Sequence, residues 1–224
     1  MPARVCVVGS AGRMGRAVIE AAAGRDLTIA AAVDRGDDLE AALAASDVYV
    51  DFSAPDATRA TAALAARQRR AAVIGTTGLG EADEAALAAL AAVAPVVVAA
   101  NFSLGVNLVL GLVQQAARAL GPDWDAEVVE THHGAKRDAP SGTALMIARA
   151  IAAGHGVAYD DVKRHARDGD VGPRPRGEIG VASVRGGDVV GEHTAYFFGA
   201  GERLEISHRA TSRSIFAVGA LRAA

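Results

Sequence analysis

The sequence has little of several features that mark particular classes of protein. Its one cysteine, Cys6, excludes an internal disulfide and suits a reducing compartment. Aromatic residues make up only 4 % of the chain, which disfavours a stacking platform for nucleic acids or sugars. The formal net charge of −3 argues against a general polyanion binder, and no apolar run is long enough to span a membrane. We therefore expect a cytoplasmic protein without nucleic-acid or membrane partners.

The first part of the chain alternates between short apolar strands and helices. Residues 4–9 already have strand character, which predicts that no signal peptide is present. Short, continuous apolar strands separated by helices are typical of a parallel sheet that is covered on both faces. The expected strands are residues 5–8, 27–33, 48–52, 72–75 and 96–99, and the expected helices are 14–23, 57–67 and 81–93.

The pattern changes after about residue 101. Further helices are expected at residues 104–120, 143–153 and 214–222, with strands at 126–131, 178–184, 188–198 and 203–208. Short glycine-containing links join the last three strands, which suggests an antiparallel meander, and the charged segment 165–177 is expected to be a mobile loop. The fold class is therefore α/β. A Rossmann-like parallel-sheet domain (1–101, joined by the C-terminal segment 212–224) accompanies an α+β domain with a mainly antiparallel sheet (102–211).

A glycine-rich turn follows the first expected strand and opens the first expected helix. It has the pattern G-x-x-G-x-x-G, from Gly9 through Gly12 to Gly15. Glycines allow the backbone to approach a pyrophosphate, and the helix N-terminus offers N–H groups and the positive end of its dipole. The motif gains specificity from its place in a βαβ unit, and it predicts a bound nicotinamide dinucleotide. The alternative is a turn that only lets helix and strand pack.

Two charged residues end the second expected strand. Asp34 lies about twenty residues after the last glycine, where a carboxylate can accept hydrogen bonds from the adenosine ribose. Arg35 can bind the 2′-phosphate of NADP, although a solvated loop arginine is the simpler alternative. The pair suggests that both NADH and NADPH are used. The loops 75–78 and 99–102 also follow strands, so they are candidates to line the nicotinamide ribose.

The segment from Glu130 to Thr143 is the part of the sequence richest in side chains that can take part in catalysis. His132 and His133 titrate near neutral pH, and Lys136 is a further possible proton donor. Ser141 is placed to cap a helix whose first N–H groups can bind a carboxylate. This combination suits a reductase of a small dicarboxylate, although structural histidines remain the alternative. A metal site is not expected, because the other histidines are scattered and no cysteine joins them; these are His155, His165, His193 and His208.

Several of these motifs occur together in one known family. They are residues 9–15, 51–55, 74–78, 100–107, 130–144, 191–194 and 203–208, and they span nearly the whole chain. In this respect the sequence resembles the 4-hydroxy-tetrahydrodipicolinate reductases, also called dihydrodipicolinate reductases, of lysine and diaminopimelate biosynthesis. Two departures are a shorter interval between Asp34 and Asp51 and the end of the chain at Ala224, before a tail that members usually carry.

The resemblance implies an activity, an assembly and a set of site residues. The expected enzyme uses NADH or NADPH to reduce the dehydrated form of 4-hydroxy-tetrahydrodipicolinate to tetrahydrodipicolinate, as a homotetramer joined through the sheet of the second, substrate-binding domain. By position, the catalytic residues are His132 and Lys136, and the substrate-binding residues are His133, Ser141, Gly142 and Thr143. The dinucleotide contacts are Gly9, Ser10, Ala11, Gly12, Arg13, Met14, Asp34, Arg35, Gly75, Thr76, Thr77, Ala99, Ala100, Asn101 and Phe102.

Two other functions use part of the same pattern. Another two-domain NAD(P) oxidoreductase, such as an amino-acid or semialdehyde dehydrogenase, shares the glycine turn but does not need the segment 130–143. A non-catalytic dinucleotide-binding sensor needs the turn alone, and the proton-donor segment argues against it.

Overall fold

The computed structural model describes residues 2–224, which divide into two compact units. Unit 1 comprises Met1–Ser103 together with Arg213–Ala224, and unit 2 comprises Leu104–Ser212. The chain thus leaves unit 1 once and returns to it at the end. No helix among the described residues has the length and apolar character needed to cross a membrane.

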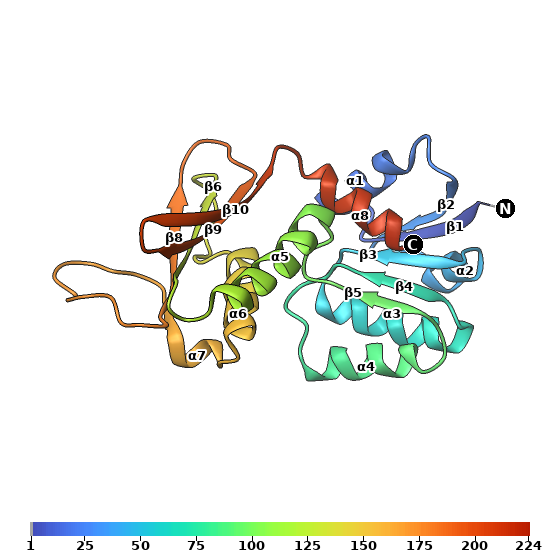
Figure 1. The fold of residues 1–224 in the computed structure, drawn as a ribbon. Coiled ribbons are helices and arrows are strands. Elements are labelled where there is room, and N and C mark those ends of the chain that lie inside the picture. Colours follow the sequence, from blue (N-terminus) through green and yellow to red (C-terminus); the bar gives the residue numbers. More distant parts are fainter. Residues whose placement is uncertain (1) are drawn as a thin grey trace. The chain divides into compact units, whose positions relative to one another are not determined.

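Unit 1 is built on a five-stranded parallel sheet in the order β2-β1-β3-β4-β5 (Figure 1). Its strands are β1 (Ala3–Val8), β2 (Leu27–Val33), β3 (Val48–Asp51), β4 (Ala71–Ile74) and β5 (Val96–Val98). Its helices are α1 (Arg13–Ala22), α2 (Leu39–Ala44), α3 (Pro55–Gln68), α4 (Glu81–Ala91) and α8 (Ser214–Ala223). The parallel dinucleotide-type sheet predicted from the sequence is confirmed.

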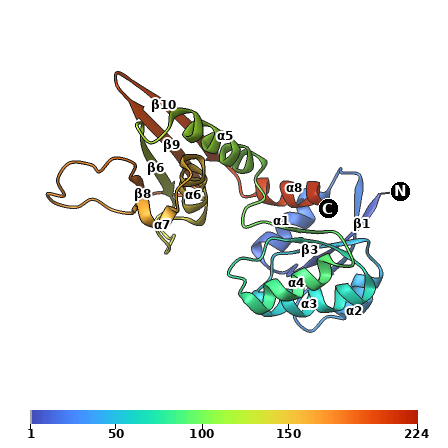
Figure 2. The same cartoon turned by 60° about the horizontal axis from the view of Figure 1, so that its bottom comes forward.

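The alternation of side chains along β1 divides the core of unit 1 between two faces of the sheet. Val5 and Val7 pack with α1 and α8, whereas Cys6 and Val8 pack with α2, α3 and α4 (Figures 1 and 2). Burial raises the pKa of the Cys6 thiol to about 11, as expected for a cysteine that serves packing. Because helices cover both faces, the central strands β1, β3 and β4 are largely buried, whereas Val97 and Val98 of the edge strand β5 are exposed.

The closing helix α8 completes the core on the α1 side of the sheet. Ala217, Ala220 and Leu221 are buried there, beside the strand residues of unit 1. A Cβ added at Gly219 would lie 1.8 Å from the carbonyl oxygen of Phe102, so only glycine allows α8 to approach this closely.

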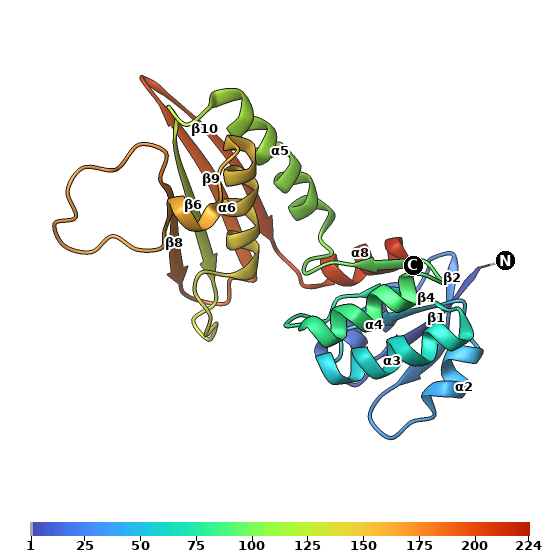
Figure 3. The same ribbon diagram turned by 90° about the horizontal axis from the view of Figure 1, so that it is seen from below.

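Unit 2 contains a mixed five-stranded sheet in the order β10-β9-β6-β8-β7, with α5 and α6 against one face (Figure 3). Its strands are β6 (Asp125–His132), β7 (Lys163–Arg164), β8 (Ile179–Arg185), β9 (Gly191–Gly199) and β10 (Glu202–Ala210). Its helices are α5 (Leu104–Leu120), α6 (Gly142–His155) and α7 (Tyr159–Val162). The antiparallel pairs β9–β10 and β6–β9 have nine and seven register partners, against seven and two in the parallel pairs β6–β8 and β7–β8, which confirms the mainly antiparallel character predicted for this sheet.

The predicted meander of the last three strands is wrong. β6 lies between β8 and β9, and it pairs with β8 in parallel. The link from β8 to β9 passes over the end of β6 and is hydrogen-bonded to it. The N–H of Gly186 donates to the carbonyl of His132 at 2.9 Å, and the N–H of His133 donates to the carbonyl of Val189 at 2.8 Å. A short link therefore joins strands that are not neighbours, which the alternation of apolar residues cannot reveal.

Three short elements, α2, α7 and β7, were not predicted from the sequence. They have six, four and two residues, too few for a periodic pattern. α2 begins at Asp38, whose side chain accepts a hydrogen bond from the Ala41 N–H at 3.0 Å.

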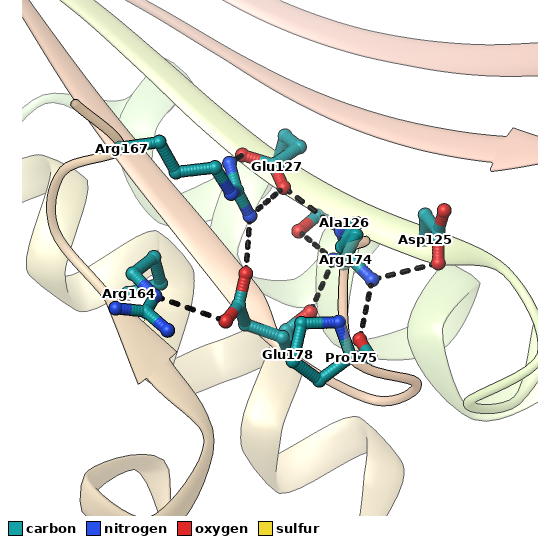
Figure 4. A network of polar contacts seen from close by, with 8 residues as sticks. All are labelled: Asp125, Ala126, Glu127, Arg164, Arg167, Arg174, Pro175 and Glu178. Carbon is teal, nitrogen blue, oxygen red and sulfur yellow. Dashed lines mark hydrogen bonds and ion pairs between the residues drawn. The ribbon is translucent and has the colours of Figure 1, made fainter. Parts of the chain in front are cut away.

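The segment between β7 and β8 is held to the sheet by arginine side chains (Figure 4). Arg174 donates to Asp125 Oδ1 at 2.7 Å, to Glu127 Oε1 at 3.1 Å and to the carbonyl of Ala126 at 3.0 Å. Arg167 bonds the Glu127 carboxylate through both terminal nitrogens, at 3.0 and 2.8 Å, and also contacts Glu178. The segment predicted to be a loop is confirmed as one, and its base is fixed by ion pairs.

Candidate functional site

In unit 1, the glycine-rich turn has the geometry of a backbone that approaches a ligand. Gly9 has φ +78°, in the left-handed region that favours glycine. The N–H groups of Gly9 and Ser10 both donate to the carbonyl of Val33, at 3.0 and 3.1 Å, so the turn is fixed to the end of β2. Gly12 is the N-cap of α1, and no side chain caps the N-terminus of this helix. Such an end binds anions such as a pyrophosphate.

Asp34 connects the glycine turn with the end of β2. Its Oδ2 accepts from the Ala11 N–H at 2.9 Å, and its Oδ1 accepts from the Arg35 N–H at 2.8 Å. The hydrogen bonds from Arg35 and then Ala11 lower the pKa of the Asp34 carboxyl, so it is ionised at neutral pH. An ionised carboxylate accepts, as a ribose hydroxyl requires.

The turn and Asp34 border a cavity of about 550 Å³ within unit 1. Of the residues predicted to contact a dinucleotide, Gly9, Ala11, Gly12, Asp34 and Arg35 line it. The opposite wall of the cavity was not predicted from the sequence. It is formed by residues of the β3–α3 region, among them Phe52, Ser53, Ala54, Ala57 and Thr61. The size and the convergent polar groups are those of a small-molecule site.

The other predicted dinucleotide residues do not line this cavity. Ser10 and Met14 are half-buried, and Met14 packs against the core on the α1 side, whereas Arg13 is exposed. The remaining predicted residues follow the carboxyl ends of β4 and β5, which is the side where open α/β sheets bind ligands. They are Gly75, Thr76, Thr77, Ala99, Ala100, Asn101 and Phe102.

Phe52 fixes the loops that follow three neighbouring strands. Its ring occupies the space beside Gly75, where an added Cβ would lie 2.0 Å from Phe52 Cε1. It also meets the ring of Phe102 edge-to-face, with centroids 6.0 Å apart. Phe102 is buried in the core, so it holds the loop after β5 in place from within.

The side chain of Thr76 belongs to a buried hydrogen-bond network. Its Oγ1 accepts from Thr58 Oγ1 at 2.9 Å and lies 3.3 Å from Asp51 Oδ1. The same Asp51 oxygen accepts from the N–H and the hydroxyl of Ser53, at 2.8 and 2.5 Å. Burial raises the pKa of Asp51. This network positions the loops after β3 and β4.

In unit 2, Glu130 lies at the centre of a second cluster of polar side chains, which includes His132, Ser141 and Arg185. Alternation along β6 directs Glu130 and His132 to the same buried side. Oε2 of Glu130 accepts from His132 Nδ1 at 2.5 Å, and Oε1 accepts from the Ser141 N–H at 3.1 Å. Arg185 donates to both oxygens at 2.8 Å. Burial opposes the charge of Glu130, but hydrogen bonds, above all from Arg185, outweigh it and lower the carboxyl pKa to about 2.

His193, which lies on β9, also belongs to this cluster of polar side chains. The strand register places it opposite Glu130, its ring centroid lies 5.2 Å from that of His132, and its Nε2 lies 3.0 Å from Ser141 Oγ. Burial and then the charge of His132 lower the His193 pKa to about 4. The expectation that His193 is one of the scattered histidines was therefore wrong. The pairing of β9 with β6 brings His193 beside Glu130. The motif 191–194, which contains His193, was the part of the sequence that could have indicated this.

The remaining predicted substrate and catalytic residues lie between β6 and α6. Lys136 Nζ donates to both carboxylate oxygens of Asp138 at 2.9 Å, and this bond lowers the pKa of Asp138. Ser141 caps α6, because its hydroxyl accepts from the Ala144 N–H at 3.1 Å. Gly142 and Thr143 form the first turn of that helix, where the dipole favours an anion. Glu130 thus contacts both His132 and the N-cap residue of α6, Ser141.

Within residues 2–224, no group of three or more histidine, cysteine, aspartate or glutamate side chains is arranged to hold a metal ion. The carboxylates of Glu130 and Asp138 are instead paired with histidine, arginine, lysine and backbone N–H donors.

Comparisons with known proteins agree over the full chain. The family model described as "Dihydrodipicolinate reductase, N-terminus" matches residues 3–102, and that described as "Dihydrodipicolinate reductase, C-terminus" matches residues 105–224. A 4-hydroxy-tetrahydrodipicolinate reductase of Alkalilimnicola ehrlichii is 48 % identical, with 100 % of this chain and 93 % of the relative covered. That of Zymomonas mobilis is 46 % identical, with 99 % and 90 % covered.

Solved structures share the fold. A dipicolinate-bound dihydrodipicolinate reductase from Paenisporosarcina sp. TG-14 has a TM-score of 0.81 at 25 % identity, covering 99 % of this chain and 92 % of that one. GenD2 from gentamicin A biosynthesis, solved in complex with NAD, has a TM-score of 0.60 at 15 % identity, covering 99 % and 84 %. The second likeness concerns the fold alone. Unit 1 accordingly has a dinucleotide-binding fold.

Proposed function

Because this chain belongs to the dihydrodipicolinate reductase family, we propose that it reduces the dehydrated form of 4-hydroxy-tetrahydrodipicolinate to tetrahydrodipicolinate, in lysine and diaminopimelate biosynthesis. The observation that carries the proposal is the contact of Glu130 with both His132 and the capped start of α6. This contact supports a proton donor beside a carboxylate-binding helix end, as reduction of a cyclic dicarboxylate requires.

The proposed cofactor is NADH or NADPH, which supplies a hydride when it is bound. The fit is supported by the absence of a side chain at Gly15, where a Cβ would lie 2.2 Å from the carbonyl oxygen of Gly9. The pyrophosphate is assigned to the turn from Gly9 to Met14, and the adenosine ribose to Asp34. Arg35 lines the same cavity and offers a cation for a 2′-phosphate. We expect a less than about tenfold preference between the two cofactors, which titration of both would measure.

The proposed substrate contacts follow from the ends of β6 and α6. One carboxylate is assigned to the N–H groups of Gly142 and Thr143 and to Ser141, with His133 as a further contact. His132 is the proposed acid, since its Nδ1 is held by Glu130 and its Nε2 is the nitrogen left for proton transfer. Lys136 is the second proposed proton donor. The relative from Paenisporosarcina, whose structure holds dipicolinate, supports a ligand of this chemical class.

We further propose that the protein is a homotetramer, assembled through the sheet of unit 2, and that it works in the cytoplasm. The helices α5 and α6 pack on one face of this sheet. Alternation directs Val184 and Phe198 to the opposite face, where they are 47 % and 39 % exposed, and Phe198 stacks on Tyr196. An apolar sheet face of this kind is suited to a subunit interface. Sedimentation equilibrium would measure the assembly.

The decisive experiment is an assay coupled to the upstream synthase, in which NADPH consumption is followed by its ultraviolet absorbance. Consumption that depends on the synthase product supports the proposal. Turnover of an amino acid or a semialdehyde in place of that product would instead identify another NAD(P) oxidoreductase. NADPH binding without consumption would identify a sensor.

A further inference from the structure

Glu130 contacts three parts of unit 2 that are separate in the sequence. Its two carboxylate oxygens accept from the ring of His132, from the backbone of Ser141 and from both terminal nitrogens of Arg185. The side chain is completely buried. A buried carboxylate with every lone-pair direction used has one orientation, so the groups that it holds are oriented with it.

Arg185 extends this arrangement to the segment that carries Lys136. Its Nη2 donates to the carbonyl of Asp138 at 2.7 Å, in addition to its bond with Glu130. Asp138 in turn accepts from Lys136 through its carboxylate. The ion pair between Glu130 and Arg185 therefore connects both proposed proton donors with the N-cap of α6.

The orientation of His132 determines which ring nitrogen is available. A hydrogen bond from Nδ1–H to Glu130 selects one tautomer and leaves Nε2 for transfer. Gly191 keeps space at that nitrogen, because an added Cβ there would lie 2.9 Å from His132 Nε2.

We propose that Glu130, held by Arg185, is a positioning residue that orients His132 and the carboxylate-binding start of α6 as one unit. This inference rests on the proposed function of the same site. Glu130 itself does not need to touch the substrate, since its effect passes through the imidazole and through the backbone of Ser141.

The test compares Glu130→Gln with Glu127→Gln. Glu127 lies on the same strand, is paired with Arg167 and Arg174, and contacts neither His132 nor Ser141 (Figure 4). For Glu130→Gln we expect kcat to fall by about a hundredfold or more, in the manner of an imidazole that has lost its orienting carboxylate. Glu127→Gln should leave kcat unchanged.

Folding is controlled with a second variant and a measurement on the wild type. Glu130→Gln with Arg185→Met removes both charges together and leaves no unpaired buried guanidinium; its kcat should remain as low as that of Glu130→Gln. Nitrogen NMR of the wild-type protein should show that neutral His132 carries its proton on Nδ1. Circular dichroism reports whether each variant is folded.

The outcomes separate this inference from the proposed function. If the wild type does not reduce the synthase product, the proposed function fails. If the wild type is active and His132→Ala is not, while Glu130→Gln keeps the wild-type kcat, the positioning role of Glu130 is refuted. An unprotonated Nδ1 in neutral His132 would refute it as well.

Discussion

Gly15 of α1 is pressed against the carbonyl oxygen of Gly9, so that an added Cβ would lie only 2.2 Å away. The third glycine of the motif is therefore required by the closure of the turn onto its own helix. The close approach gives the turn one conformation directly before the N-terminus of α1, whose first N–H groups can bind an anion.

We expect Gly15→Ala to weaken binding of both NADH and NADPH by about tenfold or more, because the turn must open to accept the methyl group. Fluorescence titration of the bound nicotinamide measures this loss. Gly111→Ala is the matched control, since Gly111 lies in α5 and an added Cβ there meets no atom within 4 Å. Equal affinity in the two variants would contradict the assignment of the turn to the cofactor.

Replacement of His132 or Lys136 by alanine should lower turnover by about a hundredfold or more and leave the dissociation constant of NADPH unchanged. The reason is that both groups are assigned to proton transfer, in a different unit from the glycine turn. Steady-state kinetics and titration give the two quantities separately. Lys163→Ala is the control for Lys136, because it also removes a lysine paired with an aspartate, Asp160. Wild-type turnover in His132→Ala would exclude it as the acid.

The buried His193 predicts a pH dependence of stability. Its pKa is about 4 in the folded protein, below the ordinary histidine value of 6.5, so the unfolded chain binds more protons between these values. The free energy of unfolding should be fully developed above pH 6.5 and fall by roughly 3 kcal/mol as the pH approaches 4. Urea unfolding at several pH values measures this. In His193→Gln the slope over the same range should be smaller, and an unchanged slope would show that another group titrates.

Arg174 should be the principal anchor of the segment between β7 and β8. It is 19 % exposed and bonds two carboxylates and backbone carbonyls, whereas the ion pair of Arg176 with Asp123 has both side chains at least 70 % exposed. We expect Arg174→Ala to speed amide hydrogen exchange across residues 165–178, because it leaves Glu127 with one arginine. Arg176→Ala should change the exchange little. Equal effects would show that the surface pair contributes as much as the half-buried one.

The sequence was sufficient for those features that depend on local periodicity. The extents of β2 and α5 were predicted to the residue, because each combines an apolar pattern with clear end signals. The parallel sheet of unit 1 followed from apolar runs with no polar side. The glycine turn, Asp34 and the capped start of α6 could be placed for the same reason, since each depends on neighbours in the chain.

Features that depend on strand pairing could not be predicted in this way. No local pattern shows that β6 is inserted between β8 and β9, and this insertion is what brings His193 opposite Glu130. Arg185 reaches Glu130 because parallel pairing sets the ends of β6 and β8 side by side. Glu130 was visible within its motif, but a role for it required knowledge of what surrounds the carboxylate.

The return of α8 to unit 1 has a consequence for the order in which the protein is made. Translation produces residues 2–103 first, yet Ala217, Ala220 and Leu221 arrive only after the whole of unit 2 has been synthesised. Until then, the apolar surface around Val5, Val7 and Phe102 lacks its cover. We therefore expect unit 2, which is continuous in the chain, to reach its native state on the ribosome before unit 1 does. A nascent chain stalled before residue 213 should expose this surface to chaperones.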